Sequence, residues 1–175
     1  AACGAPLNCR SFVRRSGDQI RMIRIVRAGS ADEWAEARRL LGQYQASLDF
    51  ALDFQAFDHE LESLEGEYGG PHRLFLIAER EGVAVGCVGL RRFSQGVCEM
   101  KRLFTIPAAR SQGTGRALAE AVIAAARELG YARMLLDTVP SMAAAQRLYT
   151  ALGFVPREPY RYNPIPGAVF MELSL

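Results

Sequence analysis

The segment Arg110-Ser-Gln-Gly-Thr-Gly115 has the residue types and spacing of a site that binds a diphosphate. It follows a predicted strand that ends at Ile106 and precedes a long stretch with helical periodicity, so its glycines fall where a helix begins. The first turn of a helix leaves N–H groups without partners and carries partial positive charge. Glycine lets a phosphate approach those groups, and Arg110 and Arg116 would add positive charge. The alternative is a simple glycine turn at the start of a helix.

Two other diphosphate-binding motifs fit this segment poorly. A dinucleotide-binding fingerprint needs a third glycine, and Leu118 occupies that place, although Asp137 stands about 20 residues on, as a ribose-binding acid would. The preceding strand, residues 98–105, carries three charges, whereas a central parallel strand is almost wholly apolar. A loop of the Walker type is excluded because the chain contains no Gly-Lys-Ser/Thr.

Three motifs in order resemble the GNAT superfamily of N-acetyltransferases. Arg110-x-x-Gly113-x-Gly115 resembles that family's Q/R-x-x-G-x-G/A pyrophosphate loop, and residues 99–105 before it are similar to the family's fourth strand. Residues 145–154, Ala-Gln-Arg-Leu-Tyr-Thr-Ala-Leu-Gly-Phe, resemble its A-x-x-L-Y-x-x-x-G-F segment. The resemblance covers about residues 22–175. Each motif alone is moderately specific, and their order and spacing make the resemblance strong.

The resemblance implies acetyl-CoA as a co-substrate, bound in a sheet that splays open beside the fourth strand. The pantetheine arm would lie along Leu103–Thr105, and the pyrophosphate would sit on the amides of residues 110–115. Met142 stands where the family often has an Asn, seven residues before its Tyr, so that contact would pass to Ser141 or to a backbone group. The residues predicted to bind the co-substrate are Leu103, Phe104, Thr105, Arg110, Ser111, Gln112, Gly113, Thr114, Gly115, Arg116 and Ser141.

Acetylation of an amine requires a base, because a free lysine-like amine has a pKa near 10.4 and is protonated at neutral pH. Glu99 is the candidate base, since strict alternation places it on the same strand face as Lys101, Leu103 and Thr105. The alternative for Glu99 is a strand-surface charge paired with an arginine. Glu172 and Asp137 are weaker candidates.

Tyr149 matches the tyrosine that the GNAT family uses to protonate the departing thiolate, with a core tyrosine on a helix as the alternative. Backbone N–H groups near Leu103 could stabilise the charge on the carbonyl oxygen. The loop before the last strand contains Tyr160, Tyr162 and Asn163, which are candidates for binding the acceptor. The alternative is a rigid surface turn.

The elements that position these residues follow from periodicity and turn signals. Residues 22–27 predict a strand, and Ser30 or Asp32 can cap the helix that follows. The remaining elements are a helical stretch over 53–67 with an acidic outer face, a three-strand meander over 74–78, 83–93 and 97–106, a helix over 113–130, a strand over 131–137, a helix capped by Ser141, and strands over 154–155 and 167–173. This order predicts an α+β fold, a mixed α/β sandwich. Its central sheet would be mixed but mostly antiparallel, with about six to seven strands flanked by about four helices.

Composition excludes several other classes of protein. Half of the 175 residues are hydrophobic and no stretch reaches the ~18 apolar residues of a membrane span, so no membrane is expected. Residues 1–27 hold six Arg against one acid, which leaves the rest of the chain negative and gives no basis for binding nucleic acid. Four Cys without metal spacing predict no metal and a reducing, cytoplasmic setting. Of the 21 basic residues, 20 are Arg and only Lys101 is Lys.

The length predicts one domain. Residues 22–175 would form a single acetyltransferase domain, and residues 1–21 a flexible N-terminal extension. The predicted function is acetyl-CoA-dependent N-acetylation of a primary amine on a small molecule or amino-acid-like acceptor, by direct attack in a ternary complex. The alternatives are a protein N-terminal or lysine acetyltransferase, a longer acyl donor, and a non-catalytic acyl-CoA-binding sensor or partner module. A route through Cys98 and a homodimer are also left open.

Overall fold

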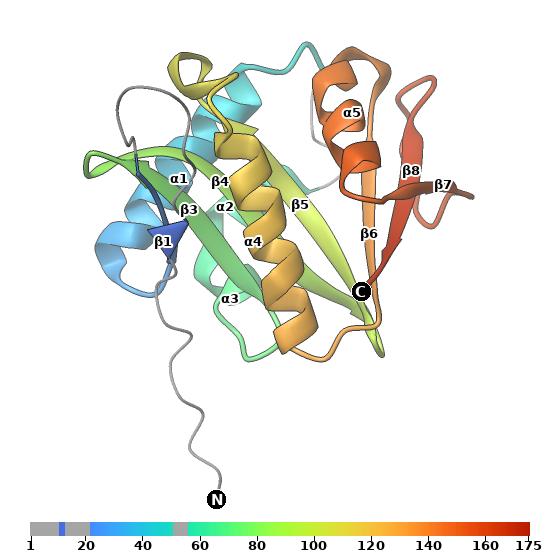
Figure 1. Ribbon diagram of the computed structural model, residues 1–175, viewed down its shortest axis with the longest axis horizontal. Helices are drawn as coiled ribbons and strands as arrows, with labels where there is room; N and C mark the ends of the chain where they lie inside the picture. Colours follow the sequence, from blue (N-terminus) through green and yellow to red (C-terminus); the bar gives the residue numbers. More distant parts are fainter. Residues whose placement is uncertain (1–10, 13–21, 51–55) are drawn as a thin grey trace, which may run out of the picture.

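The computed structural model describes residues 11–12, 22–50 and 56–175. Over these residues the chain forms one sheet with the strand order β1-β2-β3-β4-β5-β6-β8-β7 (Figure 1). The strands are β1 Ser11–Phe12, β2 Ile23–Arg27, β3 Leu74–Arg80, β4 Val83–Ser94, β5 Val97–Thr105, β6 Arg133–Thr138, β7 Val155–Arg157 and β8 Val169–Ser174. The helices are α1 Ala31–Ala46, α2 Phe57–Glu62, α3 Leu64–Tyr68, α4 Thr114–Glu128 and α5 Ala143–Ala151.

The predicted fold class is confirmed. Neighbouring strands are antiparallel except for β5 and β6, which pair in parallel. The two-residue strand β1, which pairs with β2, adds a strand inside the segment predicted to be a flexible extension. The rest of that segment, residues 1–10 and 13–21, lies outside the described residues, so its flexibility stays a prediction.

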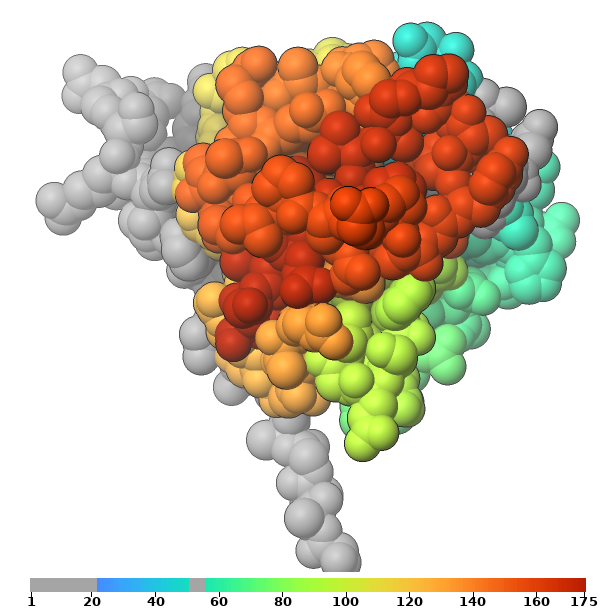
Figure 2. All heavy atoms as spheres, turned by 90° about the vertical axis from the view of Figure 1, so that its right-hand side faces the viewer, coloured from blue at the N-terminus to red at the C-terminus, as the bar shows by residue number. Residues whose placement is uncertain are grey.

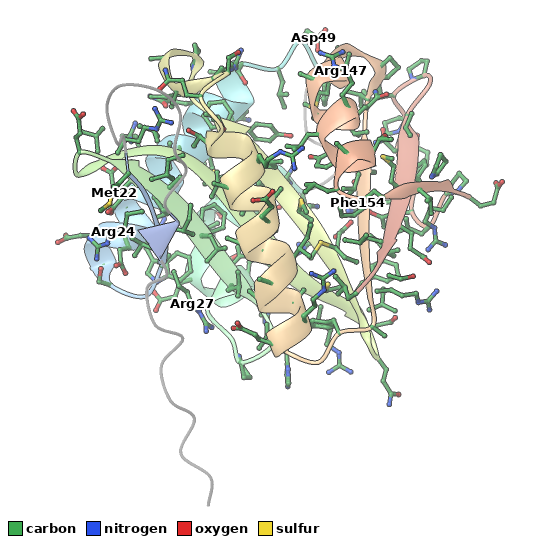
Figure 3. All side chains as sticks on the ribbon, viewed as in Figure 1. Met22, Arg24, Arg27, Asp49, Arg147 and Phe154 are labelled. Atoms are coloured by element: carbon green, nitrogen blue, oxygen red, sulfur yellow. The ribbon has the colours of Figure 1, made fainter. Side chains whose placement is uncertain are left out.

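Helices cover both faces of the sheet. Figure 1 shows α4 and α5 in front of the sheet and α1, α2 and α3 behind it. One hydrophobic core lies under α4 and α5, and Phe154, which is labelled in Figure 3, packs into it directly after α5. The second core joins Trp34 and Leu41 of α1 to Phe75 of β3 on the other face. Among the described residues, no helix has both the length and the apolarity to cross a membrane.

Local sequence signals explain the starts of α1 and α4 but not those of α2, α3 and α5. Ser30 caps α1, since its hydroxyl accepts from the Glu33 N–H at 3.3 Å while Glu33 accepts from the Ser30 N–H at 2.8 Å. The prediction that Ser141 caps the next helix is wrong, because Pro140–Met142 forms a 3₁₀ turn and α5 starts one residue later without a side-chain cap. The predicted helix over 53–67 is two short helices that break at Ser63, and residues 51–55 lie outside the described part.

A bulge in β5 changes which side chains share a face. Gly89 pairs with Lys101 and Cys87 with Phe104, so only Val88 stands opposite the two residues between them. Arg102 takes the extra place with a φ of 59°. The predicted parity is therefore wrong, because Leu103 packs with the α4 core while Phe104 packs with the α1 core.

The sheet splits between β5 and β6. Their parallel pairing covers only three pairs and ends at Glu99 opposite Leu135, although β5 continues to Thr105 and β6 to Thr138. The two strand ends diverge at the edge from which α4 and α5 begin. This split is the feature that the resemblance implied beside the fourth strand.

Candidate active site

The turn before α4 presents backbone amides to open space. Gly113 caps the helix with a φ of 82°, and Ser111 is also left-handed at 58°. The first helical bond runs from the Ala117 N–H to the Gly113 carbonyl at 3.0 Å, so the N–H groups of residues 114–116 have no acceptor inside the helix. A Cβ built on Gly113 would meet nothing within 4 Å, which shows that the space beside this turn is open.

A groove of about 700 Å³ runs from this turn along the end of β5. Ten of the eleven residues predicted to bind the co-substrate line it: Leu103, Phe104, Thr105, Arg110, Ser111, Gly113, Thr114, Gly115, Arg116 and Ser141. Sequence reasoning missed Tyr44 of α1, Ala145 and Leu148 of α5, and the flanking residues Leu48 and Met142, all of which line the groove. Asp49, another lining residue, lies at the top of Figure 3, at the same end of the molecule as the start of α4.

Gln112 is the predicted residue that does not line the groove. Arg80 of β3 donates hydrogen bonds to the side-chain and main-chain oxygens of Gln112, the latter at 2.7 Å. Gln112 Nε2 in turn donates to the Ala108 carbonyl at 2.7 Å. These contacts tie the turn to β3, so the side chain supports the turn.

Thr114 gives the clearest test of whether this turn suits a phosphate. The residue lines the groove and is 1% exposed, and its buried Oγ1 has no hydrogen-bond partner among the described residues. A buried hydroxyl without a partner is costly unless a ligand satisfies it. The hydroxyl, the free amides and the two arginines Arg110 and Arg116 therefore fit the diphosphate of coenzyme A.

A smaller cavity of about 60 Å³ lies in the split between β5 and β6. It shares Tyr44, Leu103, Met142 and Ala145 with the groove, so the two are contiguous. Its other lining residues are Phe50, Met100, Lys101, Arg102, Asp137, Thr138, Val139, Tyr149 and Asn163. We call this space the split cavity. It combines charged, phenolic and apolar groups at the inner end of the groove.

Tyr149, the predicted acid, lines the split cavity from α5. The residue is 7% exposed, and burial raises the pKa of its phenol above the ordinary value. The ring packs against Phe154 with centroids 5.7 Å apart. The hydroxyl is therefore held in its protonated form, which is the form that can donate a proton.

Glu99, the predicted base, does not line the groove or the split cavity. Arg161 and Tyr160 donate to its Oε1 at 2.6 and 2.9 Å, and Arg91 donates to Oε2 at 3.4 Å. The carboxylate instead borders a separate cavity of about 530 Å³ that Arg73 also lines. Both carboxylate oxygens of Glu99 accept hydrogen bonds from neighbouring side chains. These contacts give Glu99 a structural role in this position.

The three predicted acceptor residues occupy different environments. Asn163 lines the split cavity and donates to Asp137 Oδ2 at 2.8 Å. Tyr160 stacks edge-on against Phe93 and Phe170, and Tyr162 is 77% exposed. Figure 2 shows the C-terminal segment, in orange and red, spread over this face of the molecule. The structure thus brings Asn163 to the split cavity, but not Tyr160 or Tyr162.

A buried ion pair holds the bulge of β5 in place. Arg102 donates to Glu60 from Nη2 at 2.7 Å and from Nε at 3.0 Å, and Tyr68 donates to the same carboxylate at 2.6 Å. Burial alone would raise the pKa of Glu60, but the hydrogen bonds and charge of Arg102 outweigh it and lower the pKa to about 2. The charge of Arg102 is thereby neutralised at the wall of the split cavity.

A turn with free amides that leads through a groove to a split sheet and a buried tyrosine is the arrangement expected of an acyltransferase. The sequence model of the Acetyltransferase (GNAT) family matches residues 34–154. The chain belongs to this family of acetyltransferases. The described residues hold no group of three or more His, Cys, Asp or Glu side chains placed for a metal.

Similar proteins support the same assignment. An uncharacterised N-acetyltransferase of Schizosaccharomyces pombe is 40% identical over 140 residues, which cover 79% of this chain and 86% of the relative. A protein of Azospirillum brasilense named IAA acetyltransferase is 35% identical, covering 80% of this chain and 86% of its own length. The structure of a Salmonella typhimurium acetyltransferase with acetyl-CoA has a TM-score of 0.64 at 22% identity, covering 87% and 93% of the two chains.

Proposed function

We propose that this protein transfers the acetyl group of acetyl-CoA to a primary amine of a small-molecule or amino-acid-like acceptor. The observation that carries the proposal is the continuous path from the amide-lined turn of α4 to Tyr149 in the split cavity. Acetyl-CoA supplies the acetyl group as an activated thioester. The groove, with a volume of about 700 Å³, has room for the pantetheine arm of that molecule.

The residues that would hold acetyl-CoA are those of the turn and of the end of β5. The amides of residues 113–116 and the hydroxyl of Thr114 would bind the diphosphate, with positive charge from Arg110 and Arg116. The edge of β5 beyond Glu99 has no pairing with β6, so backbone groups there that have no other partner would bond the pantetheine amides. The Thr105 carbonyl already accepts from Arg110 Nε at 3.3 Å. Residues 103–105 form the second half of this edge.

Within the split cavity, Tyr149 would donate a proton to the departing sulfur. A backbone N–H near Leu103 would stabilise the charge that develops on the carbonyl oxygen. Asn163 and Asp137, joined by their hydrogen bond, would contact the acceptor at the far side of the split. We assign Glu99 to hold the 160–161 segment through Tyr160 and Arg161, in place of the role of base.

Direct attack is favoured over a covalent acetyl-enzyme. Cys98 is buried and donates to the Arg133 carbonyl at 3.4 Å, and burial raises the pKa of its thiol to about 12. Such a thiol is a poor nucleophile at neutral pH. Cys87 and Cys98 are both free thiols, which agrees with the cytoplasmic location that we propose.

The test is release of free CoA over a panel of small amines, amino acids, lysine-containing peptides and IAA. Turnover with a small amine supports the proposal, and turnover with peptides alone would favour a protein acetyltransferase. Isothermal titration with acetyl-CoA runs beside the assay. Binding of acetyl-CoA without turnover on any panel member would overturn the enzymatic proposal in favour of a non-catalytic binding module.

A further inference from the structure

Lys101 is an exception in this chain. It is the only lysine among 21 basic residues, and it lies on β5 at the point where the sheet has just split. The residue is 6% exposed and lines the split cavity. Its Nζ has no hydrogen-bond partner within the described part of the chain. The amine is thus enclosed beside the space into which the groove leads.

The neighbouring carboxylates are engaged by other donors. Arg91 and Arg161 hold Glu99, Arg102 holds Glu60, and Asn163 donates to Asp137. The charges that act on Lys101 are those of Glu99 and Arg102 on β5, Arg91 on β4 and Glu60 on α2. Asp137 on β6, Tyr149 on α5 and Tyr44 on α1 line the split cavity with it, and the ring of Tyr68 on α3 lies against Gly89, the partner of Lys101 on β4. Burial, with further contributions from Arg102 and Arg91, lowers the pKa of Lys101 to about 7.

A buried amine without a partner is expensive unless a ligand uses it. Thr138, which lines the split cavity from β6, also has a buried hydroxyl without a partner in the described residues. Two unsatisfied polar groups on opposite sides of the split indicate that a polar group of a ligand belongs between them. The acetyl donor reaches this space from the α4 side, so the remaining ligand is the acceptor amine.

A lysine at this position, in place of an arginine, distinguishes a role in proton transfer from a role as a fixed positive charge. An arginine would supply a fixed positive charge and would suffice to anchor an anion, and the chain uses Arg at every other basic position. A lysine is the one basic side chain here that can lose its proton when buried. The exception therefore favours a role in proton transfer over a role as a fixed charge.

We propose that Lys101, in its neutral form, is the base that accepts a proton from the ammonium group of the acceptor in the split cavity. This inference rests on the proposed N-acetyltransferase function and assigns its base. Glu99 then acts as a positioning residue for the loop that carries Asn163.

The proton balance of the reaction is complete without a further reactant. The acceptor ammonium gives one proton to Nζ of Lys101, and the free amine forms a C–N bond as the C–S bond breaks. The nitrogen's second proton passes to the phenolate of Tyr149 and replaces the proton that Tyr149 gave to the sulfur. The proton on Lys101 leaves to solvent, so each turnover releases one amide, one CoA thiol and one proton.

The first test reads Lys101 directly, because a protein labelled with [¹³Cε]lysine gives one lysine signal. We expect its chemical shift to titrate with a midpoint near pH 7. The Arg38→Lys variant adds an exposed lysine on α1 as an internal reference, which should titrate near ~10.4. A midpoint for Lys101 close to that of the reference would overturn the proposal.

The second test compares Lys101→Arg with Lys101→Met in the CoA-release assay, using the best small amine of the panel. We expect both variants to lose at least ~10²-fold in kcat/KM, and the wild-type fall in rate below pH 7 to disappear. Acetyl-CoA affinity should change by less than about twofold. Activity retained in Lys101→Arg would show that a fixed charge suffices and would overturn the proposal.

Failure of this inference is distinct from failure of the proposed function. If wild-type protein binds acetyl-CoA but acetylates no amine, the function itself is wrong and the assignment of a base falls with it. If wild-type protein is active and Lys101→Met retains its rate and pH profile, only the assignment is wrong. Thermal unfolding of each variant excludes a loss of activity that comes from unfolding.

Discussion

The turn that begins α4 and the split between β5 and β6 differ in the polar groups that they bring to the candidate site. At the turn, the polar groups beside the open groove are the backbone amides of residues 114–116, which have no acceptor inside the helix. In the split, the groups are buried side chains, and Lys101 Nζ and Thr138 Oγ1 have no partner among the residues described. We therefore propose that the first region binds the co-substrate and that the second carries the reaction.

The difference follows from what each region must do. A diphosphate keeps its charge throughout the reaction, so fixed dipoles of the backbone suffice to hold it. Proton transfer needs groups whose charge changes, and burial is what brings the pKa of Lys101 to about 7. Substitutions at the turn should therefore alter affinity, and substitutions in the split should alter turnover or the stability of the split itself.

The largest effect is expected on stability, at the ion pair that supports the split. Glu60→Gln removes the negative charge that Glu60 supplies to the buried guanidinium of Arg102, and should cost about 3–5 kcal/mol of unfolding free energy. Glu36→Gln, which removes an exposed partner of Arg39, should cost less than ~0.5 kcal/mol and serves as the control. Urea unfolding measures both, and equal losses would show that the pair does not hold the bulge.

The same pair predicts how stability depends on pH. The pKa of Glu60 is about 2 in the folded protein, below its value of ~4.3 in an unfolded chain. The contribution of ionised Glu60 to the free energy of unfolding is therefore complete above pH ~4.3 and is lost as the pH falls toward 2. Urea unfolding between pH 6 and 2.5 should show a steeper loss for wild type than for Glu60→Gln.

The next largest effect is expected on binding at the turn. Gly113→Asp places a negative side chain beside the diphosphate, at a residue whose φ of 82° suits glycine. Repulsion between the two negative groups should weaken acetyl-CoA binding by about 10³-fold, as measured by isothermal titration. Gly130→Asp is the matched control, since Gly130 has a φ of 78° at the far end of α4. Unchanged affinity in Gly113→Asp would place the diphosphate elsewhere.

The order of elements could be predicted because its signals are local. Alternating and helical periodicity, the capping box at Ser30 and the turns at Gly82 and Gly96 each act within a few residues. The bulge in β5 could not be predicted, because the left-handed conformation of Arg102 accompanies an ion pair with a residue 42 positions away. That one bulge reversed the expected face of Leu103.

The turn before α4 and the split cavity also differ in how far the sequence alone could predict them. The turn could be predicted, because amides and glycines at a helix start need only local sequence to act. Lys101 was visible in the sequence as the only lysine, but its burial and its lack of a partner arise from α1, α2, β6 and α5 together. Glu99 was chosen as the base on strand alternation, and neither the bulge nor its contact with Arg161 could be inferred locally.

A smaller effect, on turnover alone, is expected for Tyr149→Phe. The phenol lines the split cavity but not the groove, so its loss should lower kcat by about 10²-fold while acetyl-CoA affinity stays within about twofold. Tyr44→Phe provides a comparison, because Tyr44 lines both spaces. Equal losses of kcat and affinity in Tyr149→Phe would assign that side chain to packing.

The smallest effect is expected for Glu99→Gln. This variant tests whether the base is Lys101 in the split cavity or Glu99 outside it. Glutamine keeps an oxygen that can accept from Tyr160 and Arg161 but removes the charge that Arg91 and Arg161 share. If Glu99 only positions the loop, KM for the acceptor should rise by less than about tenfold, with the pH profile of kcat/KM unchanged. Loss of the acidic limb of that profile in Glu99→Gln, but not in Lys101→Met, would return the role of base to Glu99.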